Sequence, residues 1–181
     1  MFAIDLGDGA ELRPLEPWQA EEFLAHMDRA REGVDPWIPW AGRSTDLDSA
    51  RATLQRYSDL AARDAGRLYG IWLDGVLVGG TMFVSFEVAY GNCEIGCWLE
   101  PAGQGRGLVT KATKYLIDWA VWERGMHRIE WITRPDNTAS SNIARRLGMK
   151  LDGVLREQYP HNGVRYDSEV WALLATEWRT R

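Results

Sequence analysis

The chain of 181 residues lacks several features, and each absence narrows the class of protein it can be. No apolar run approaches the roughly 20 residues of a membrane-spanning helix, and the N-terminus has no basic and apolar segments typical of a secretory signal. Lys and Arg are not in excess: the formal net charge of −5 argues against nucleic acid as a partner. Repeats and Pro/Gly/Ser-rich linkers are also absent, so we expect a single domain over residues 1–181.

Cysteine is scarce, with Cys93 and Cys97 the only two in the chain. On one strand they would lie about 13 Å apart, which is too far for a disulfide, and their spacing does not fit a zinc site. Unpaired thiols are typical of a reducing compartment. The three histidines suggest no metal site, and His26 is expected on a helix surface. We therefore expect a cytoplasmic protein that uses no metal and does not bind a membrane.

The residues that are present predict a mixed α/β fold. The chain is 45% hydrophobic and has ten tryptophans, enough for a sizeable core. Periodicity and turn signals indicate seven strands and four helices: a strand at 11–16, helices at 17–31 and 46–64, a hairpin turning at 74–75, a strand at 92–100, a helix at 107–124, a strand at 127–133, a helix at 137–148, and a closing pair around 161–163. The order predicts a mostly antiparallel central sheet of about seven strands with flanking helices and one parallel pair.

A glycine-rich stretch, "GQGRGLVTKA" at 103–112, stands between a predicted strand and a predicted helix. A Walker A loop would need Lys and Ser/Thr after the last glycine, where Leu108 and Val109 stand. The dinucleotide fingerprint would need a third glycine at position 108, where the chain has Leu108, so the stretch matches this motif weakly. A third option is an anion site at the helix N-terminus, in which Arg106 adds a charged contact. From the residues alone, a plain surface turn is an equal alternative.

Three motifs in order resemble those of the GCN5-related N-acetyltransferases (GNAT), most closely the RimJ/RimL-type branch. They are "QGRGLV" at 104–109, "NTAS" at 137–140 followed by "LGM" at 147–149, and the closing "DGVLREQYPHNGVRYDSEVWALLATEW". The resemblance covers residues 67–178. Val109 stands where the family has a small residue.

The resemblance implies the GNAT fold and an acyl-CoA-dependent N-acyltransferase, with acetyl-CoA expected and succinyl-CoA left open. The acyl group would pass in a ternary complex to a primary amine, either a ribosomal or other protein N-terminus or a small-molecule amine. Backbone groups of Cys97, Trp98 and Leu99 would pair with the pantetheine. The diphosphate would lie on the amides of Gln104, Gly105, Arg106, Gly107, Leu108 and Val109, with Thr110 nearby, and Asn137 and Ser140 would contact CoA.

The same resemblance suggests the catalytic groups. Glu94 lies on the strand where family members carry a catalytic glutamate, and it would accept the amine proton; a salt-bridged strand residue is the alternative, with Glu87 and Asp167 as other candidates. The tyrosine that usually protonates the thiolate is replaced by Ala144, so Ser140 is the candidate acid, with Ser141 as an alternative.

Two tryptophans, Trp37 and Trp40, fall where the fold builds its acceptor pocket, and Tyr159 would form the opposite wall. Anchoring of a loop on the core is an equal alternative for both tryptophans. A non-catalytic CoA-binding module and a nucleotide-dependent enzyme remain rival functions. The sequence also leaves a homodimer open.

Overall fold

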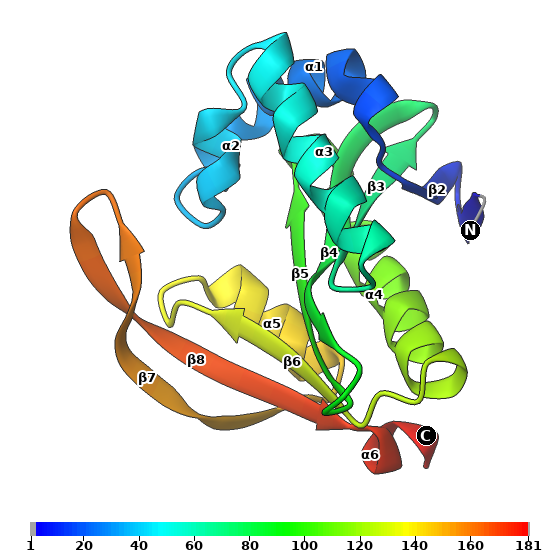
Figure 1. Cartoon of the computed structure of the whole chain (residues 1–181), viewed down its shortest axis with the longest axis vertical. Coiled ribbons are helices and arrows are strands. Elements are labelled where there is room, and N and C mark those ends of the chain that lie inside the picture. Colours follow the sequence, from blue (N-terminus) through cyan, green and yellow to red (C-terminus); the bar gives the residue numbers. More distant parts are fainter. Residues whose placement is uncertain (1–2, 181) are drawn as a thin grey trace. The chain divides into compact units, whose positions relative to one another are not determined.

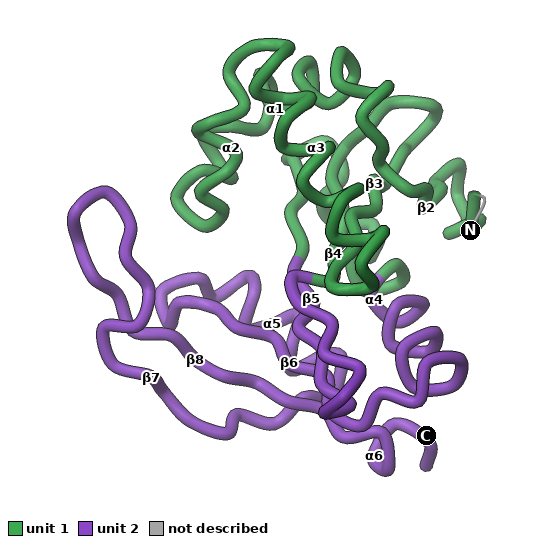
Figure 2. The backbone as a smooth tube through the Cα atoms, viewed as in Figure 1, with its two compact units in different colours: residues 1–83, 97–112 green, residues 84–96, 113–181 purple. Residues whose placement is uncertain are grey.

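The computed structural model describes residues 3–180 and divides into two compact units (Figure 2). Unit 1 comprises residues up to 83 together with 97–112, and unit 2 comprises 84–96 together with 113 onward. Eight strands are hydrogen-bonded in the order β1-β2-β3-β4-β5-β6-β8-β7. The pair β5–β6 is parallel, whereas β1–β2, β2–β3, β3–β4, β6–β8 and β7–β8 are antiparallel. The expected mixed, mostly antiparallel sheet is confirmed, with one strand more than expected.

Unit 1 contains the N-terminal half of the sheet and the first three α-helices. Two strong local signals explain its elements: Asp46 accepts the Ser49 N–H at 2.8 Å and so caps α3, and Asp74 and Gly75 take positive φ of 50° and 80° in the β3–β4 turn. The elements are β1 (Ile4–Gly7), β2 (Ala10–Pro14), η1 (Pro17–Gln19), α1 (Ala20–Val34), α2 (Pro39–Arg43), α3 (Leu47–Ala62), β3 (Arg67–Leu73), the first part of β4 (Val76–Glu87), the end of β5 (Asn92–Leu99), η2 (Pro101–Gly103) and the start of α4 (Leu108–Asp118).

The core of unit 1 forms where α1 and α3 pack on β3 and β4 (Figure 1). Phe23, Leu54 and Trp72 are almost fully buried in this cluster. Each supplies a large apolar surface whose removal from water stabilises the unit.

Unit 2 contains the C-terminal half of the sheet. Its strands β7 and β8 form a long twisted hairpin ribbon (Figure 1) that turns at Asn162 and Gly163, both at positive φ. Besides parts of β4, β5 and α4, its elements are the π-helical η3 (Trp119–Glu123), β6 (Arg128–Thr133), α5 (Thr138–Arg146), β7 (Lys150–His161), β8 (Val164–Leu174) and α6 (Ala175–Arg179).

Four local expectations are corrected. Strand β1 was not expected, the connector before α3 contains the short helix α2, and α6 follows β8. His26 is fully buried rather than on a helix surface, because it lies on the face of α1 that also carries Phe23, Met27 and Ala30. Over residues 3–180, every helix is too short or too polar to cross a bilayer.

Candidate functional site

The three glycines of the glycine-rich loop have different structural roles. Gly103 is buried, and a Cβ there would lie 2.8 Å from Leu99 Cδ1 and 3.2 Å from Val78 Cγ2, so this glycine allows close packing. Gly105 and Gly107 are exposed and take positive φ of 78° and 70°, with no atom within 4 Å of a Cβ at either position. The open space beside these two glycines is what an approaching ligand would need.

The free main-chain donors of this loop begin at Gly105. The Gln104 N–H is already donated to Pro101 O at 3.1 Å, which corrects the expectation that the Gln104 amide belongs to the anion site. The first α4 amide with a helical acceptor is that of Lys111, which donates to Gly107 O at 3.0 Å. Amides before it in the first turn have no acceptor within the helix, so they can hold an anion at the positive end of its dipole.

Bulk at the start of α4 does not obstruct this loop. Leu108 and Val109 are only 2% and 6% exposed, so their bulk packs into the protein, and the space beside Gly105 and Gly107 stays open. Arg106 is exposed beside them and can add a charge-assisted contact. The residues therefore fit a diphosphate, including at Val109, where the family motif is not matched.

The end of β5 approaches β4 very closely in unit 1. A Cβ at Gly79 would lie 2.5 Å from Trp98 O, and one at Gly80 would lie 2.2 Å from the Trp98 ring. The Glu100 N–H donates to Val78 O at 2.8 Å, just beyond the strand. Trp98 is only 4% exposed, so its indole packs in the core, and the pairing of its backbone with a cofactor stays a prediction.

Trp40 is also buried, and its ring meets Trp98 edge-on at a centroid distance of 5.1 Å. This contact favours the alternative in which Trp40 anchors its loop on the core. Trp37 is half-buried, and its part in acceptor binding stays a prediction.

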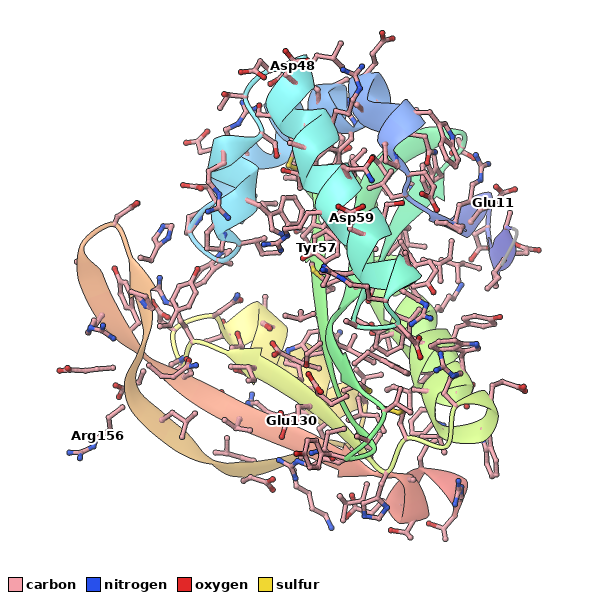
Figure 3. The ribbon with its side chains drawn as sticks, viewed as in Figure 1. Glu11, Asp48, Tyr57, Asp59, Glu130 and Arg156 are labelled. Carbon is pink, nitrogen blue, oxygen red and sulfur yellow. The ribbon has the colours of Figure 1, made fainter. Side chains whose placement is uncertain are left out.

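Glu94 is half-buried on β5, in parallel register with Glu130 of β6 (Figure 3 labels Glu130). Burial, and after it the charge of Glu130, raise the pKa of Glu94 to about 7. Arg128 Nε donates to Glu130 at 2.7 Å, and its other end pairs with Asp152 at 2.7 Å. A carboxylate with a pKa near neutrality can accept a proton and release it again at physiological pH.

Two neighbouring serines on α5 differ in what their hydroxyl groups can do. The Ser141 hydroxyl is buried and donates to Glu169 at 2.8 Å, so its proton is already engaged. The Ser140 oxygen instead accepts the Trp131 indole N–H at 2.9 Å, which leaves the Ser140 O–H to be donated elsewhere. Asn137 caps α5 by accepting the Ser140 N–H at 3.2 Å. This geometry favours Ser140 over Ser141 as a proton donor.

Aromatic side chains gather at the tip of the β7–β8 ribbon. Tyr159 stacks with His161 at 6.1 Å, and the Arg134 guanidinium lies 3.6 Å from the Tyr166 ring centroid. The Tyr166 ring therefore already carries a cation, and the part of Tyr159 in acceptor binding stays a prediction.

Asp167 has a structural role in the same ribbon. It accepts the Glu157 N–H at 2.8 Å, while Arg165 donates to the Glu157 carbonyl at 3.0 Å. Glu157 has a φ of 52° and lies within the irregular register between Leu155 and Tyr159. These bonds hold the bulge, and a part for Asp167 as a base stays a prediction.

The predicted residues divide between the two units. Unit 1 brings together the end of β5, the loop at 104–110 and Trp40, and unit 2 contains Glu94, Asn137, Ser140 and Tyr159. Sequence reasoning missed the buried pair His26 and Glu100, although the helical spacing of His26 with the apolar face of α1 was a usable signal. Among residues 3–180, no three His, Cys, Asp or Glu side chains gather as a metal site.

A family model described as an acetyltransferase (GNAT) domain matches residues 10–150. The ribosomal-protein-serine acetyltransferase of Escherichia coli K12 is 28% identical over 94% of this chain and 96% of its own. YdaF of Bacillus subtilis, named provisionally as a ribosomal N-acetyltransferase, is 27% identical over 98% of both chains. A solved structure of RimL, the ribosomal L7/L12 α-N-protein acetyltransferase, in complex with coenzyme A has a TM-score of 0.90 and 22% identity over 97% of this chain and 99% of that one, which shows the shared fold.

Proposed function

Because the chain belongs to the acetyltransferase (GNAT) domain family, we propose that it transfers an acetyl group from acetyl-CoA to a primary amine. The observation that carries this proposal is the loop at 105–110, where two positive-φ glycines and the open first turn of α4 offer main-chain donors to a diphosphate. Acetyl-CoA supplies a thioester, whose carbonyl carbon the amine attacks.

We assign the chain's own residues the following roles in that transfer. Main-chain groups of Cys97–Leu99 orient the pantetheine, and the loop fixes the diphosphate. Glu94 accepts the proton of the attacking amine as the new C–N bond forms. The Ser140 hydroxyl donates toward the sulfur as the C–S bond breaks, an orientation supported by the indole N–H that occupies its acceptor side.

The pKa of Glu94 favours one class of acceptor. An α-amine has a pKa of about 7.7–8.0, whereas a lysine amine has one of about 10.4. A base with a pKa of about 7 is well matched to the α-amine and poorly matched to lysine. We therefore propose a protein N-terminal amine as the acceptor, in keeping with the activity for which the Escherichia coli relative is named; a small-molecule amine is the alternative, since spermidine N(1)-acetyltransferase of the same organism is also similar, at 26% identity over 54% of this chain.

The proposed setting is the cytoplasm, because Cys93 and Cys97 are both free thiols. Burial raises the pKa of the Cys93 thiol to about 12, so this thiol is held protonated and unreactive.

A homodimer is proposed because the side chains of Trp18 and Trp122 are exposed, at 79% and 58%. Light scattering would test this oligomeric state.

Two measurements test the proposed function. Isothermal titration should show binding of CoA and of acetyl-CoA but not of ATP or NAD. Thiol release from acetyl-CoA should require an added amine and be faster with an N-terminal serine peptide than with the same peptide N-formylated. Binding of CoA without turnover on peptides, polyamines or amino sugars would favour a non-catalytic module. Binding of ATP or NAD in place of CoA would overturn the proposal.

A further inference from the structure

A buried chain of hydrogen bonds in unit 1 connects α1 to the end of β5. The Trp98 indole N–H donates to His26 Nε2 at 2.9 Å, and His26 Nδ1 lies 3.0 Å from Glu100 Oε2. Arg29 Nε donates to the same carboxylate oxygen at 3.2 Å. His26 is 0% exposed, and Trp98 and Glu100 are each 4% exposed. None of these three side chains can reach a ligand at the surface.

The partners of His26 fix its protonation. Because Nε2 accepts the indole N–H, the single ring proton must be on Nδ1, from which it is donated to Glu100. Burial lowers the pKa of His26 to about 4, although the Glu100 carboxylate acts in the opposite direction. A second proton, on Nε2, would place an N–H against the indole N–H. The hydrogen bond between Trp98 and His26 therefore forms only when the imidazole is neutral.

The two residues that His26 connects by hydrogen bonds, Trp98 and Glu100, lie on either side of Leu99 in the sequence. Trp98 belongs to the strand segment assigned to the pantetheine, and Glu100 is the residue before η2, which leads into the glycine-rich loop. The Glu100 carbonyl accepts the Gly103 N–H at 3.1 Å, and its own N–H is held by Val78. Arg29 also donates to Leu77 O at 2.8 Å, so the carboxylate and β4 are connected through one guanidinium.

We propose that His26 is a positioning residue for the cofactor, one that fixes the backbone from Trp98 to Glu100 and the start of the loop without touching the cofactor. The inference rests on the proposed function, because it concerns the same cofactor site. Without His26, the strand end and the loop would sample more conformations in the free protein, and binding would have to order them.

The first test measures affinity for CoA by isothermal titration. His26→Phe keeps a ring and removes both hydrogen bonds, and it should weaken CoA binding about tenfold, equivalent to ~1.4 kcal/mol. Its KM for acetyl-CoA should rise similarly, while the KM for the peptide amine stays within about twofold. His26→Gln, whose amide can both accept and donate, should recover most of the affinity.

A matched control separates positioning from general loss of stability. Ala30→Gly, in the same helix, lowers stability through helix propensity and touches none of the three hydrogen bonds. It should lower the melting temperature and leave CoA affinity unchanged. If His26→Phe does not fold, Trp98→Phe removes the indole donor and keeps an aromatic ring, and it should weaken CoA binding in the same way.

The outcomes distinguish the inference from the proposed function. CoA affinity within twofold of wild type in the variant that folds, His26→Phe or Trp98→Phe, would overturn the inference and leave the function intact. Wild-type protein that binds no CoA would overturn both. A ¹⁵N-histidine NMR spectrum should show His26 protonated on Nδ1 alone between pH 5 and 8, and a proton on Nε2 would overturn the inference.

Discussion

Glu94 is the residue whose ionisation the proposed chemistry needs, and burial, followed by the charge of Glu130, raises the pKa at which it ionises. Glu94 must be a carboxylate to accept a proton, so the rate should rise with pH through its pKa of about 7. Glu94→Gln should lower turnover by about 10²–10⁴-fold and leave CoA affinity unchanged. A rate that stays at wild-type level across the pH range would remove Glu94 from the mechanism.

The pH profile of the reaction should also report the effect of the Glu130 charge on the pKa of Glu94. Glu130→Gln removes a negative charge beside Glu94, and because that charge raises the pKa of Glu94, the acid limb of the kcat/KM profile should move to lower pH. Glu123→Gln, an exposed position in η3, is the matched control and should leave the limb in place. An unmoved limb in Glu130→Gln would show that burial alone sets the pKa.

The pH dependence of folding stability tests the same ionisation of Glu94 independently of catalysis. The pKa of Glu94 is raised in the folded protein from the ordinary 4.5 to about 7, so the folded state holds this proton more tightly than the unfolded state does. Stability from this group is therefore full below pH 4.5 and is lost as the pH rises to 7. Glu94→Gln should melt at a higher temperature than wild type at pH 8 and at an equal temperature at pH 4.5.

At the scale of elements, the close approach of β4 and β5 depends on Gly80. A Cβ there would lie 2.2 Å from the Trp98 ring and 2.3 Å from the Tyr69 carbonyl, and neither a packed indole nor a backbone can move away easily. Gly80→Ala should therefore destabilise the protein by about 3 kcal/mol in urea unfolding. Gly153→Ala places the same methyl group in open space in β7 and should change stability by less than about 0.5 kcal/mol. Equal effects of both would contradict this packing argument.

Elements with strong local signals were predictable, and those that depend on distant partners were not. The turns at Asp74-Gly75 and Asn162-Gly163 follow from residues that tolerate positive φ. In contrast, β1 is only four residues long and is a strand because Ile4 pairs with Leu12 of β2. An irregular or very short segment of this kind has no periodicity to detect.

The candidate site shows the same division between local and long-range information. The glycine motif indicated an anion site, but it did not reveal that η2 uses the Gln104 amide internally. Along β5, Cys93 and Ile95 are buried at alternate positions, but the next buried residue is Trp98 rather than Cys97, so simple strand alternation does not hold to the end of the strand. The partners of His26 come from residues more than 70 positions away, at Trp98 and Glu100, and only the fold identifies them.

For the whole molecule, the two units share continuous elements. The chain passes from one unit to the other within β4, β5 and α4 (Figure 2), so unit 1 consists of two separate segments of sequence and so does unit 2. The expectation of one domain over residues 1–181 stays a prediction, which the cooperativity of unfolding can test.

A single cooperative unfolding transition should follow from these shared strands. Thermal unfolding followed by far-UV circular dichroism and by tryptophan fluorescence should give coincident curves, with equal calorimetric and van't Hoff enthalpies. A hundredfold excess of CoA over its Kd should stabilise the folded protein by ~2.7 kcal/mol and shift both curves together, because the ligand binds a state in which all shared elements are intact. Two separated transitions, or a CoA shift seen by one probe alone, would show that the units unfold independently despite the strands they share.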